Sequence, residues 1–418
     1  MKAPMVCKDD EVTRRLAVAR WTKEGVAVWH ASFGNVVIVL EHDARCAGRL
    51  RHDEFAGLDF WAPHGDALAD LGHTLEVEHP QPATWVELAD HHAQDLSLFL
   101  EAVYDLRVTW RVCHEAMTHV ARRRSGHPLR AYLDGLTWDG TQRLETWLQT
   151  LAGVEDTPLY RAMGTAWMVC AVARVRQPGC QCDYALVLHG KQGRGKSSLF
   201  GVLGGEWYSD QAIDVRDERA GHALRGTWIH EFAELDALSR ADVSATKAFL
   251  TKRHDRYRPP YGRSYVRIPR SSVFSGTTND ETFLSDPTGN RRFWVVRSGV
   301  IHLALAAELR DQLWAEAVAA YEAGAPRFLP RDLADAHAED VDQYVHQDPW
   351  EEVLTPYLRT HHRVTPGMIY ERLNKEAKDL QRTDQLRVSA ILRRLGWERR
   401  RGRVGGLSTW VWEVPTKT

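Results

Sequence analysis

Residues 184–200 read YALVLHGKQGRGKSSLF, and this segment decides the fold. The run from Tyr184 to Leu188 is short and apolar, as a buried parallel strand is, and the residues after Ser197 have the apolar spacing of a helix. Between these two elements, residues 190–197 have the P-loop spacing of glycine, four residues and Gly-Lys-Ser. A strand, a glycine-rich turn and a helix in this order place backbone N–H groups and a helix N-terminus around a polyphosphate. The segment therefore predicts a site for ATP and Mg²⁺.

The residues of this turn have separable roles. The glycines let the backbone turn tightly around phosphate oxygens, Lys196 neutralises the β and γ phosphates, and Ser197 ligates Mg²⁺. The predicted nucleotide-binding residues are Gly190, Gly193, Arg194, Gly195, Lys196, Ser197 and Ser198. A glycine-rich turn with a chance lysine is the alternative, and the full spacing with both flanking elements argues against it.

Strand-like and helical runs alternate around this turn. The strand-like runs are residues 227–232, 272–276 and 293–296, and the helical runs are residues 196–203, 241–250 and 303–322. This alternation predicts an α/β fold with a parallel sheet, which we assign to a nucleotide-binding domain at residues 181–325.

Acidic residues follow the first of these strand-like runs. A P-loop enzyme needs a carboxylate at the end of a neighbouring strand, to hold magnesium and to polarise the attacking water. Glu231 ends the apolar run and Glu234 lies just beyond it. We assign Glu231 to the metal and Glu234 as the better candidate for the general base. Two surface acids after an edge strand are the alternative.

Two further segments carry candidate catalytic residues. Asn279 follows the strand-like run at 272–276 and could orient the water, although asparagine is also an ordinary turn residue. Arg291 and Arg292 precede the next run, and arginine stabilises the dispersed charge of phosphoryl transfer, commonly from a neighbouring subunit. A structural ion pair is the competing explanation for these arginines.

Basic residues mix with aromatic ones between residues 252 and 263, a composition that suits phosphate contacts and base stacking on single-stranded DNA. The candidate contacts are Lys252, Arg253, His254 and Arg256. A solvated basic loop is the alternative.

Residues 351–418 contain 14 Lys and Arg residues against 8 Asp and Glu, so this is the basic part of the chain. Two helices, at 366–373 and 384–395, precede a basic run and a strand at 410–412, as in a winged-helix domain. The candidate DNA contacts are Arg393, Arg394, Arg400 and Arg401. A helical lid that contacts only protein is the alternative.

The remaining segments complete the expected organisation. Residues 1–125 are expected to form a mainly helical accessory domain, with residues 126–180 as a helical collar before the motor and 326–350 as a linker. The apolar run at 36–40 is too short for its periodicity to decide, although its Val and Ile content suggests a strand.

Composition bounds the class of protein. With 418 residues and 44% hydrophobic content, the chain can form two or three globular domains, and 54 basic residues against 56 acidic ones leave no global charge to indicate a partner. We expect a soluble cytoplasmic protein, because no apolar stretch has the length of a signal peptide core or a membrane span. Cys180 and Cys182 lack evident further ligands nearby, which favours reduced thiols over a metal site.

The order of motifs resembles the virulence-associated protein E family, whose motor is similar to superfamily 3 helicases. The matching phrases are HPLRAYLDGLTWDGTQRLETWL at 127–148, VARVRQPG at 172–179, LHGKQGRGKSSLF at 188–200, KAFLTKRHDRYRPPYGR at 247–263 and TTNDETFLSDPTGNRRFW at 277–294. The resemblance implies an AAA+-like core, a hexameric ring and a pore hairpin at residues 252–263. It also implies that Lys196 and Ser197 are the Walker A pair, that Glu231 and Glu234 form the acidic motif, and that Asn279 is the sensor.

The chain departs from this family at Ala233, where members often carry an acid, which weakens the choice of base. No acidic cluster typical of a primase is apparent before residue 125.

The sequence thus predicts an ATP-dependent DNA helicase or translocase in replication of a phage or mobile element. A DNA-binding ATPase switch that loads or regulates replication or defence proteins without unwinding remains an alternative, as does a nucleotide-stabilised scaffold.

Overall fold

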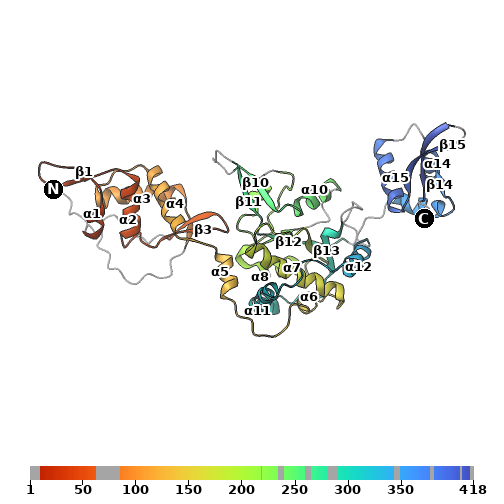
Figure 1. Ribbon diagram of the computed structural model, residues 1–418, viewed down its shortest axis with the longest axis horizontal. Coiled ribbons are helices and arrows are strands. Elements are labelled where there is room, and N and C mark those ends of the chain that lie inside the picture. The colour runs from red at the N-terminus through yellow and green to blue at the C-terminus, as the bar shows by residue number, and fades with distance from the viewer. Residues whose placement is uncertain are drawn as a thin grey trace. The chain divides into compact units, whose positions relative to one another are not determined.

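The computed structural model groups the chain into two compact units, which are described separately (Figure 1). The first comprises Met1–Leu136 with Arg225–Thr227, and the second Thr137–Leu224 with Trp228–Thr418. The structure describes residues 10–62, 85–217, 219–233, 240–258, 265–280, 290–342, 349–376, 381–404 and 407–414. Among these residues, no helix has both the length and the apolar character required to span a membrane.

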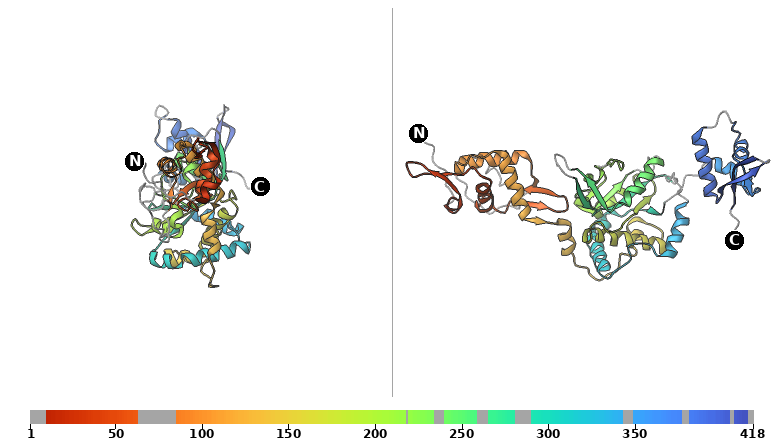
Figure 2. Two further views of the ribbon diagram at one scale, coloured as in Figure 1. Left: turned by 90° about the vertical axis from the view of Figure 1, so that its left-hand side faces the viewer. Right: turned by 45° about the horizontal axis from the view of Figure 1, so that its top comes forward.

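The first unit combines helices with short strands. Its helices are α1 (Asp10–Arg15), α2 (Phe33–His42), α3 (Asp90–Tyr104), α4 (Trp110–Arg123) and α5 (Pro128–Gly135). Its strands are β1 (Val18–Trp21), β2 (Ala27–Trp29), β3 (Leu50–Asp53), β4 (Leu58–Trp61), β5 (Val86–Glu87) and β6 (Ser125–Gly126). The helices α2 and α3 both pack on α4. In Figure 2, α2 is red and α3 and α4 are orange. The region expected to be mainly helical therefore also contains two small sheets, β1-β2 and β5-β4-β3-β6.

Residues 36–40, whose composition suggested a strand, lie in helix α2. The Ser32 hydroxyl caps this helix by accepting a hydrogen bond from the Asn35 amide at 3.4 Å. Val36, Val39 and Leu40 are all buried and follow the three- and four-residue spacing of one helix face. Burial of that face and a capped N-terminus outweigh the small helix penalty of valine and isoleucine.

The second unit is built on a five-stranded sheet in the order β13-β7-β12-β9-β8, with every neighbouring pair parallel. The strands are β7 (Ala185–His189), β8 (Tyr208–Ser209), β9 (Ile229–Phe232), β12 (Val273–Thr278) and β13 (Phe293–Arg297). The predicted α/β class with a parallel sheet is confirmed. All residues of β7 and β12 are buried, because helices cover both faces of the sheet.

One face of this sheet packs on the helices α9 (Ala220–Ala223), α10 (Arg240–Leu250) and α12 (Arg331–Asp342), through a core that includes Phe249, Phe274 and Val341. The other helices of the domain are α6 (Trp147–Ala152), α7 (Pro158–Arg176), α8 (Lys196–Gly204) and α11 (Leu303–Glu322). Of these, α7 is tied to β12 because the Trp167 indole donates to the Phe274 carbonyl at 2.9 Å. The Trp314 indole of α11 donates to the Leu203 carbonyl of α8 at 2.9 Å. The second of these bonds holds the C-terminal end of α8, the helix that follows the glycine-rich turn.

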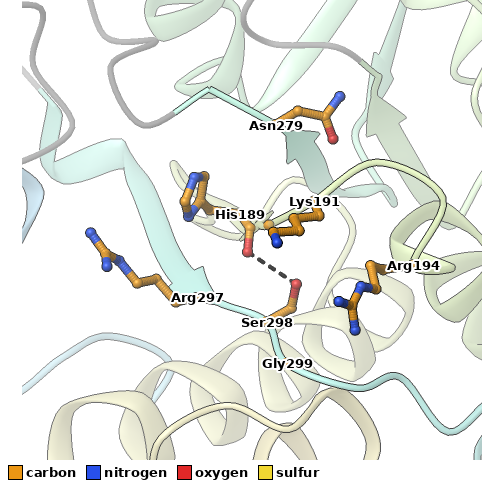
Figure 3. A pocket seen from close by; sticks show the side chains of 8 residues that line it. His189, Lys191, Arg194, Asn279, Arg297, Ser298 and Gly299 are labelled. Carbon is orange, nitrogen blue, oxygen red and sulfur yellow. Dashed lines mark hydrogen bonds between the residues drawn. The ribbon is translucent and has the colours of Figure 1, made fainter.

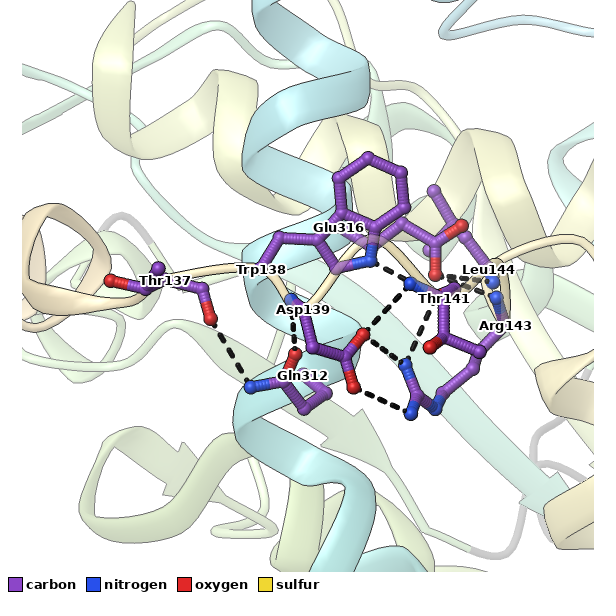
Figure 4. Close-up of polar contacts among 8 residues, drawn as sticks. All are labelled: Thr137, Trp138, Asp139, Thr141, Arg143, Leu144, Gln312 and Glu316. Carbon is purple, nitrogen blue, oxygen red and sulfur yellow. Dashed lines mark hydrogen bonds and ion pairs between the residues drawn. The ribbon is translucent and has the colours of Figure 1, made fainter.

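Residues 137–144 are joined to α11 by polar contacts, which Figure 4 displays. One carboxylate oxygen of Glu316 accepts from the backbone amides of Arg143 and Leu144, at 2.7 and 2.9 Å. Burial raises the pKa of Glu316, and the two amide donors oppose that shift. The side chain of Arg143 forms two hydrogen bonds to Asp139, each 2.8 Å long. This segment therefore fixes α6 and α7 against the helix that packs on α8.

Two departures from the expected organisation occur after residue 326. The segment expected to be a linker contains α12, because Val341 joins the core of the sheet. The chain then forms a small domain with α13 (Pro349–Leu358), β14 (Arg363–Val364), α14 (Pro366–Arg372), α15 (Arg382–Arg394), β15 (Glu398–Val404) and β16 (Leu407–Glu413). This domain has a core of its own, in which Leu354, Ile369 and Trp412 are buried.

Candidate functional site

The glycine-rich turn, residues 190–195, joins the end of β7 to the start of α8. Gly193 and Gly195 have φ angles of +75° and +85°, which favour glycine strongly. A Cβ atom at Gly190 would lie 2.7 Å from Ser298 Oγ, so this position also requires a residue without a side chain. The spacing of the three glycines thus has a direct backbone cause.

Lys196 follows this turn as the first residue of α8 and is only 6% exposed. Its ammonium group donates hydrogen bonds to the carbonyl oxygens of Gly190 at 2.6 Å and Lys191 at 3.0 Å. It also donates to Asn279 Oδ1 at 2.8 Å, because β12 lies next to β7 and delivers Asn279 to the same edge of the sheet. Two residues predicted from separate segments are therefore in direct contact.

Glu231 is 1% exposed, and its carboxylate accepts hydrogen bonds from three hydroxyl groups. Ser197 and Thr277 each donate to its Oε1 at 2.7 Å, and the Tyr208 hydroxyl donates to its Oε2 at 2.5 Å. Burial raises the pKa of Tyr208, and Glu231 raises it further. A carboxylate beside a serine hydroxyl offers the hard oxygen ligands that Mg²⁺ prefers. Sequence reasoning missed Tyr208 and Thr277, since hydroxyl residues on strands carry no distinctive local pattern.

A cavity of about 300 Å³ opens beside the turn (Figure 3). It is lined by His189, Gly190, Lys191, Arg194, Asn279, Arg297, Ser298 and Gly299. Lys191, Arg194 and Arg297 bring three cationic side chains to the cavity, which therefore suits an anion. Arg297 was not predicted, although its position as the last residue of a strand parallel to β7 is a usable signal.

Arg291 and Arg292 lie at a different edge of the sheet. They form the short 3-10 helix η4 (Asn290–Arg292), directly before β13. Phe293 pairs with Ala185 at the start of β7, whereas Arg297 pairs with His189 beside the turn. The two predicted arginines therefore precede the strand end that is remote from Lys196, and neither lines the cavity. The predicted base, Glu234, lies outside the described residues.

The basic segment at 252–263 is in part a hairpin, formed by β10 (His254–Tyr257) and β11 (Val266–Pro269). Lys252, Arg253, His254 and Arg256 are all exposed, and Asp255 and Tyr257 alternate with them as buried residues. The Arg256 guanidinium lies 5.0 Å from the centre of the Tyr265 ring. One face of β10 is thus cationic, and the residues 259–264 that follow lie outside the described part of the chain.

A buried ion pair anchors the base of this hairpin. Arg270 is bound by Asp255 through two hydrogen bonds of 2.7 Å each, and it also donates to the Phe249 carbonyl. Burial lowers the pKa of Arg270, and Asp255 opposes that shift. Arg270 lies just ahead of β12, the strand that ends beside Asn279. The hairpin and the edge of the sheet that carries Asn279 are therefore joined through one strand.

The predicted contacts of the C-terminal domain lie on α15 and β15. Arg393 is exposed on α15, and the side chain of Arg394 lies outside the described residues. On β15, Arg400 binds Glu398 at 2.7 Å, whereas the Arg401 guanidinium lies 5.5 Å from the centre of the Trp410 ring.

Cys170 of α7 lies close to both Cys180 and Cys182, and all three are free thiols. The pKa of Cys180 is lowered to about 6, chiefly by the neighbouring Cys170 thiol, with a further contribution from Arg174 and an opposing one from burial. Among the described residues, no cluster of His, Cys, Asp and Glu has the arrangement of a metal site. Because its pKa is lowered to about 6, the thiol of Cys180 is expected to be ionised at neutral pH.

This expectation is testable by alkylation of the native protein. Iodoacetamide should modify Cys180 faster than Cys113, whose pKa burial raises to about 11, and the rate at Cys180 should fall as the pH drops below about 6. Peptide mass spectrometry after short pulses gives both rates, and Cys180→Ser provides the blank. Faster labelling of Cys113 at neutral pH would contradict the assignment.

Comparison with known proteins places this arrangement in a family. The model of the virulence-associated protein E-like domain matches residues 133–347. An apo structure of the NrS-1 C-terminal region is similar over 87% of this chain and 95% of its own, with 10% identity and a TM-score of 0.45. An A-form apo structure of that region is similar over 68% of this chain and 78% of its own, with 13% identity and a TM-score of 0.40. No curated protein sequence matches. Because the family model covers more than half of the chain and includes the sheet, the turn and the hairpin, the chain belongs to the virulence-associated protein E-like family.

Proposed function

We propose that this chain is an ATP-dependent DNA helicase or translocase that acts in replication of a phage or other mobile genetic element. One observation carries the proposal. Lys196, Asn279 and the Ser197–Glu231 pair meet at the carboxyl edge of a parallel sheet, beside a cavity lined by cationic side chains. This combination is what cleavage of a nucleoside triphosphate requires, since the reaction depends on positioning and on neutralising phosphate charge. We assign the domain to the AAA+-like P-loop class.

The assigned roles follow the contacts. Lys196 would bind the β and γ phosphates of ATP, and Ser197 and Glu231 would hold Mg²⁺, which would offset the charge of those phosphates. Asn279 orients the attacking water, because its amide already lies 2.8 Å from the lysine that binds the γ phosphate. Thr277 and Tyr208 hold the Glu231 carboxylate in place. Glu234 remains our candidate for the general base.

The position of Arg291 and Arg292 supports hydrolysis at a subunit interface. Both precede β13, at the end of the sheet away from Lys196, so they are poorly placed to reach phosphate within their own chain. Arginines of this kind commonly complete the site of a neighbouring subunit. We therefore propose a ring, with a hexamer as the expected size.

DNA is the proposed partner of the two basic surfaces. The exposed cations of β10 and of Lys252 and Arg253 suit a single strand, because guanidinium and ammonium groups meet phosphates while Tyr265 offers a ring for stacking. In the C-terminal domain, α14 and α15 are followed by the antiparallel hairpin of β15 and β16, which is the order of a winged helix. We propose that Arg393, Arg394 and Arg401 of this domain contact duplex DNA.

The decisive experiment measures ATP hydrolysis and strand displacement by the full chain on a forked duplex with Mg²⁺. Single-stranded DNA is expected to stimulate hydrolysis, and ATP is expected to drive displacement. Lys252→Ala with Arg253→Ala should reduce the stimulation, because these exposed cations contribute the phosphate contacts. The matched control is Arg20→Ala with Lys23→Ala, which removes two exposed cations from β1 and the turn that follows it.

The possible results separate the candidate functions. Stimulated hydrolysis without displacement would identify the DNA-binding switch in place of the helicase. Absence of hydrolysis under all these conditions would leave only the scaffold. Full stimulation in the Lys252 and Arg253 double variant would overturn the assignment of the hairpin.

A further inference from the structure

The hairpin of β15 and β16 separates its charges between two faces. The strands are antiparallel, and Arg399, Arg401 and Arg403 pair with Trp412, Trp410 and Ser408, respectively. Cross-strand partners project from the same face, and residues alternate between faces along each strand. One face therefore combines Arg399, Arg401 and Arg403 with Trp410 and Trp412, with no acid among these five residues; we call it the arginine face.

The opposite face contains both glutamates of the hairpin. Glu398 pairs with Glu413 in the register, and Arg400 pairs with Val411 on the same side. Arg400 binds Glu398 through hydrogen bonds of 2.7 and 3.2 Å, and Arg363 of β14 forms an ion pair with Glu413. The positive charge of Arg400 is thus already offset within the protein.

Trp410 arranges the arginine face. Trp412 is buried in the domain core at 2% exposure, whereas Trp410 lies further along the hairpin at 43% exposure. The Arg399 and Arg401 guanidinium carbons lie 4.5 and 5.5 Å from the centre of the Trp410 ring. A guanidinium stacked on an aromatic ring keeps its N–H edge available, and its orientation is fixed before a partner arrives. Less side-chain entropy is then lost when the group binds.

We propose that the arginine face is a clamp for the phosphate backbone of nucleic acid, in which Arg399 and Arg401 make the contacts and Trp410 is a positioning residue. The charge of the face favours a polyanion, and the planar N–H edges fit phosphate oxygens. This inference rests on the proposed DNA-binding function and refines it. It adds Arg399 and Trp410 to the interface and removes Arg400, which the sequence had suggested as a contact.

The test measures binding of the full chain to a fluorescent DNA duplex by anisotropy across a range of salt concentrations. Arg399→Ala and Arg401→Ala are each expected to weaken binding and to reduce the slope of log K against log salt by about 0.9, the value for one lost phosphate contact. Arg400→Ala is the matched control, since it removes the same charge from the opposite face of the same strand. It should leave both affinity and slope unchanged.

Trp410 gives a readout that charge alone does not predict. Trp410→Ala should weaken binding several-fold although no charge is lost, and Trp410→Phe should restore part of the affinity because the phenyl ring still stacks with guanidinium groups. Thermal unfolding of each variant shows whether the domain is intact. If Trp410→Ala unfolds the domain, the comparison of DNA affinity and salt slope between Arg399→Ala and Arg400→Ala still tests the proposal.

The outcomes distinguish this inference from the function on which it rests. If the unaltered chain binds no DNA, the proposed function itself fails. If it binds DNA but Arg400→Ala weakens binding as much as Arg399→Ala does, the clamp alone is wrong. Competition by a polyglutamate peptide as strong as that by DNA, at equal charge, would also overturn the proposal, because the face would then recognise any polyanion.

Discussion

Replacing Lys196 with alanine is expected to reduce ATP hydrolysis at least about 100-fold, the cost of losing one donor aimed at transition-state charge. Lys196 is 6% exposed, and its ammonium donates hydrogen bonds to the carbonyl oxygens of Gly190 and Lys191 and to Asn279 Oδ1. These three hydrogen bonds fix the position of the ammonium group. In the alanine variant a water molecule could fill the space, but it would not carry a positive charge. Phosphate release with Mg²⁺-ATP, with and without single-stranded DNA, measures the loss.

Two further variants make this result interpretable. Lys196→Arg retains the positive charge but has a larger, planar head group, and it should recover little activity in a site with so little exposure. Lys23→Ala, an exposed lysine of the first unit, should hydrolyse ATP at the unaltered rate. The unfolding midpoint of each variant, measured without nucleotide, shows whether the protein is still folded under the assay conditions. Hydrolysis by Lys196→Ala within a few-fold of the unaltered rate would remove this lysine from the mechanism.

Asp255→Asn is expected to lower the free energy of unfolding by about 3–5 kcal/mol, the usual cost of breaking a buried ion pair. The side chains of Arg270 and Asp255 are 1% and 9% exposed, and two hydrogen bonds of 2.7 Å join them. The variant leaves a buried guanidinium without its counter-charge, which carries most of the cost. Urea unfolding followed by circular dichroism measures the change.

An exposed pair provides the control for this prediction. Asp217 and Arg219 are 3.2 Å apart with side-chain exposures of 38% and 80%, and Asp217→Asn should leave the unfolding midpoint unchanged. Replacing Asp255 with leucine and Arg270 with methionine together should recover part of the stability, because no unpaired charge remains buried. Equal effects of Asp255→Asn and Asp217→Asn would mean that the hairpin base is not held by this pair.

The sequence predicted local structure best where all the residues that define an element lie within one short segment. The turn at residues 190–195 needs glycine for reasons of backbone geometry, so its spacing is visible without any tertiary information. The same applies to α7, whose Thr157 hydroxyl accepts from the Tyr160 amide at 3.1 Å and whose first residue is Pro158. Residues 36–40 were harder, because five apolar residues fit a helix and a strand equally well.

Contacts between distant segments were not accessible in this way. The order β13-β7-β12-β9-β8 depends on which strands pair, and nothing in a single strand encodes its neighbours. That order brings Thr277 and Tyr208 to Glu231. It also brings Arg297 to the cavity while placing Arg291 and Arg292 at the other end of their strand.

The sequence by itself determined the alternation of strands and helices, the glycine-rich turn and the identity of Lys196 and Ser197 as its polar residues, because these features depend on neighbours within a few positions. The tertiary structure decided which hydroxyl groups surround Glu231, which arginine lines the cavity and which face of the last hairpin is cationic. The reason is physical: strand order, register and helix packing are set by the burial of side chains from remote parts of the chain, and these alone fix which polar groups meet.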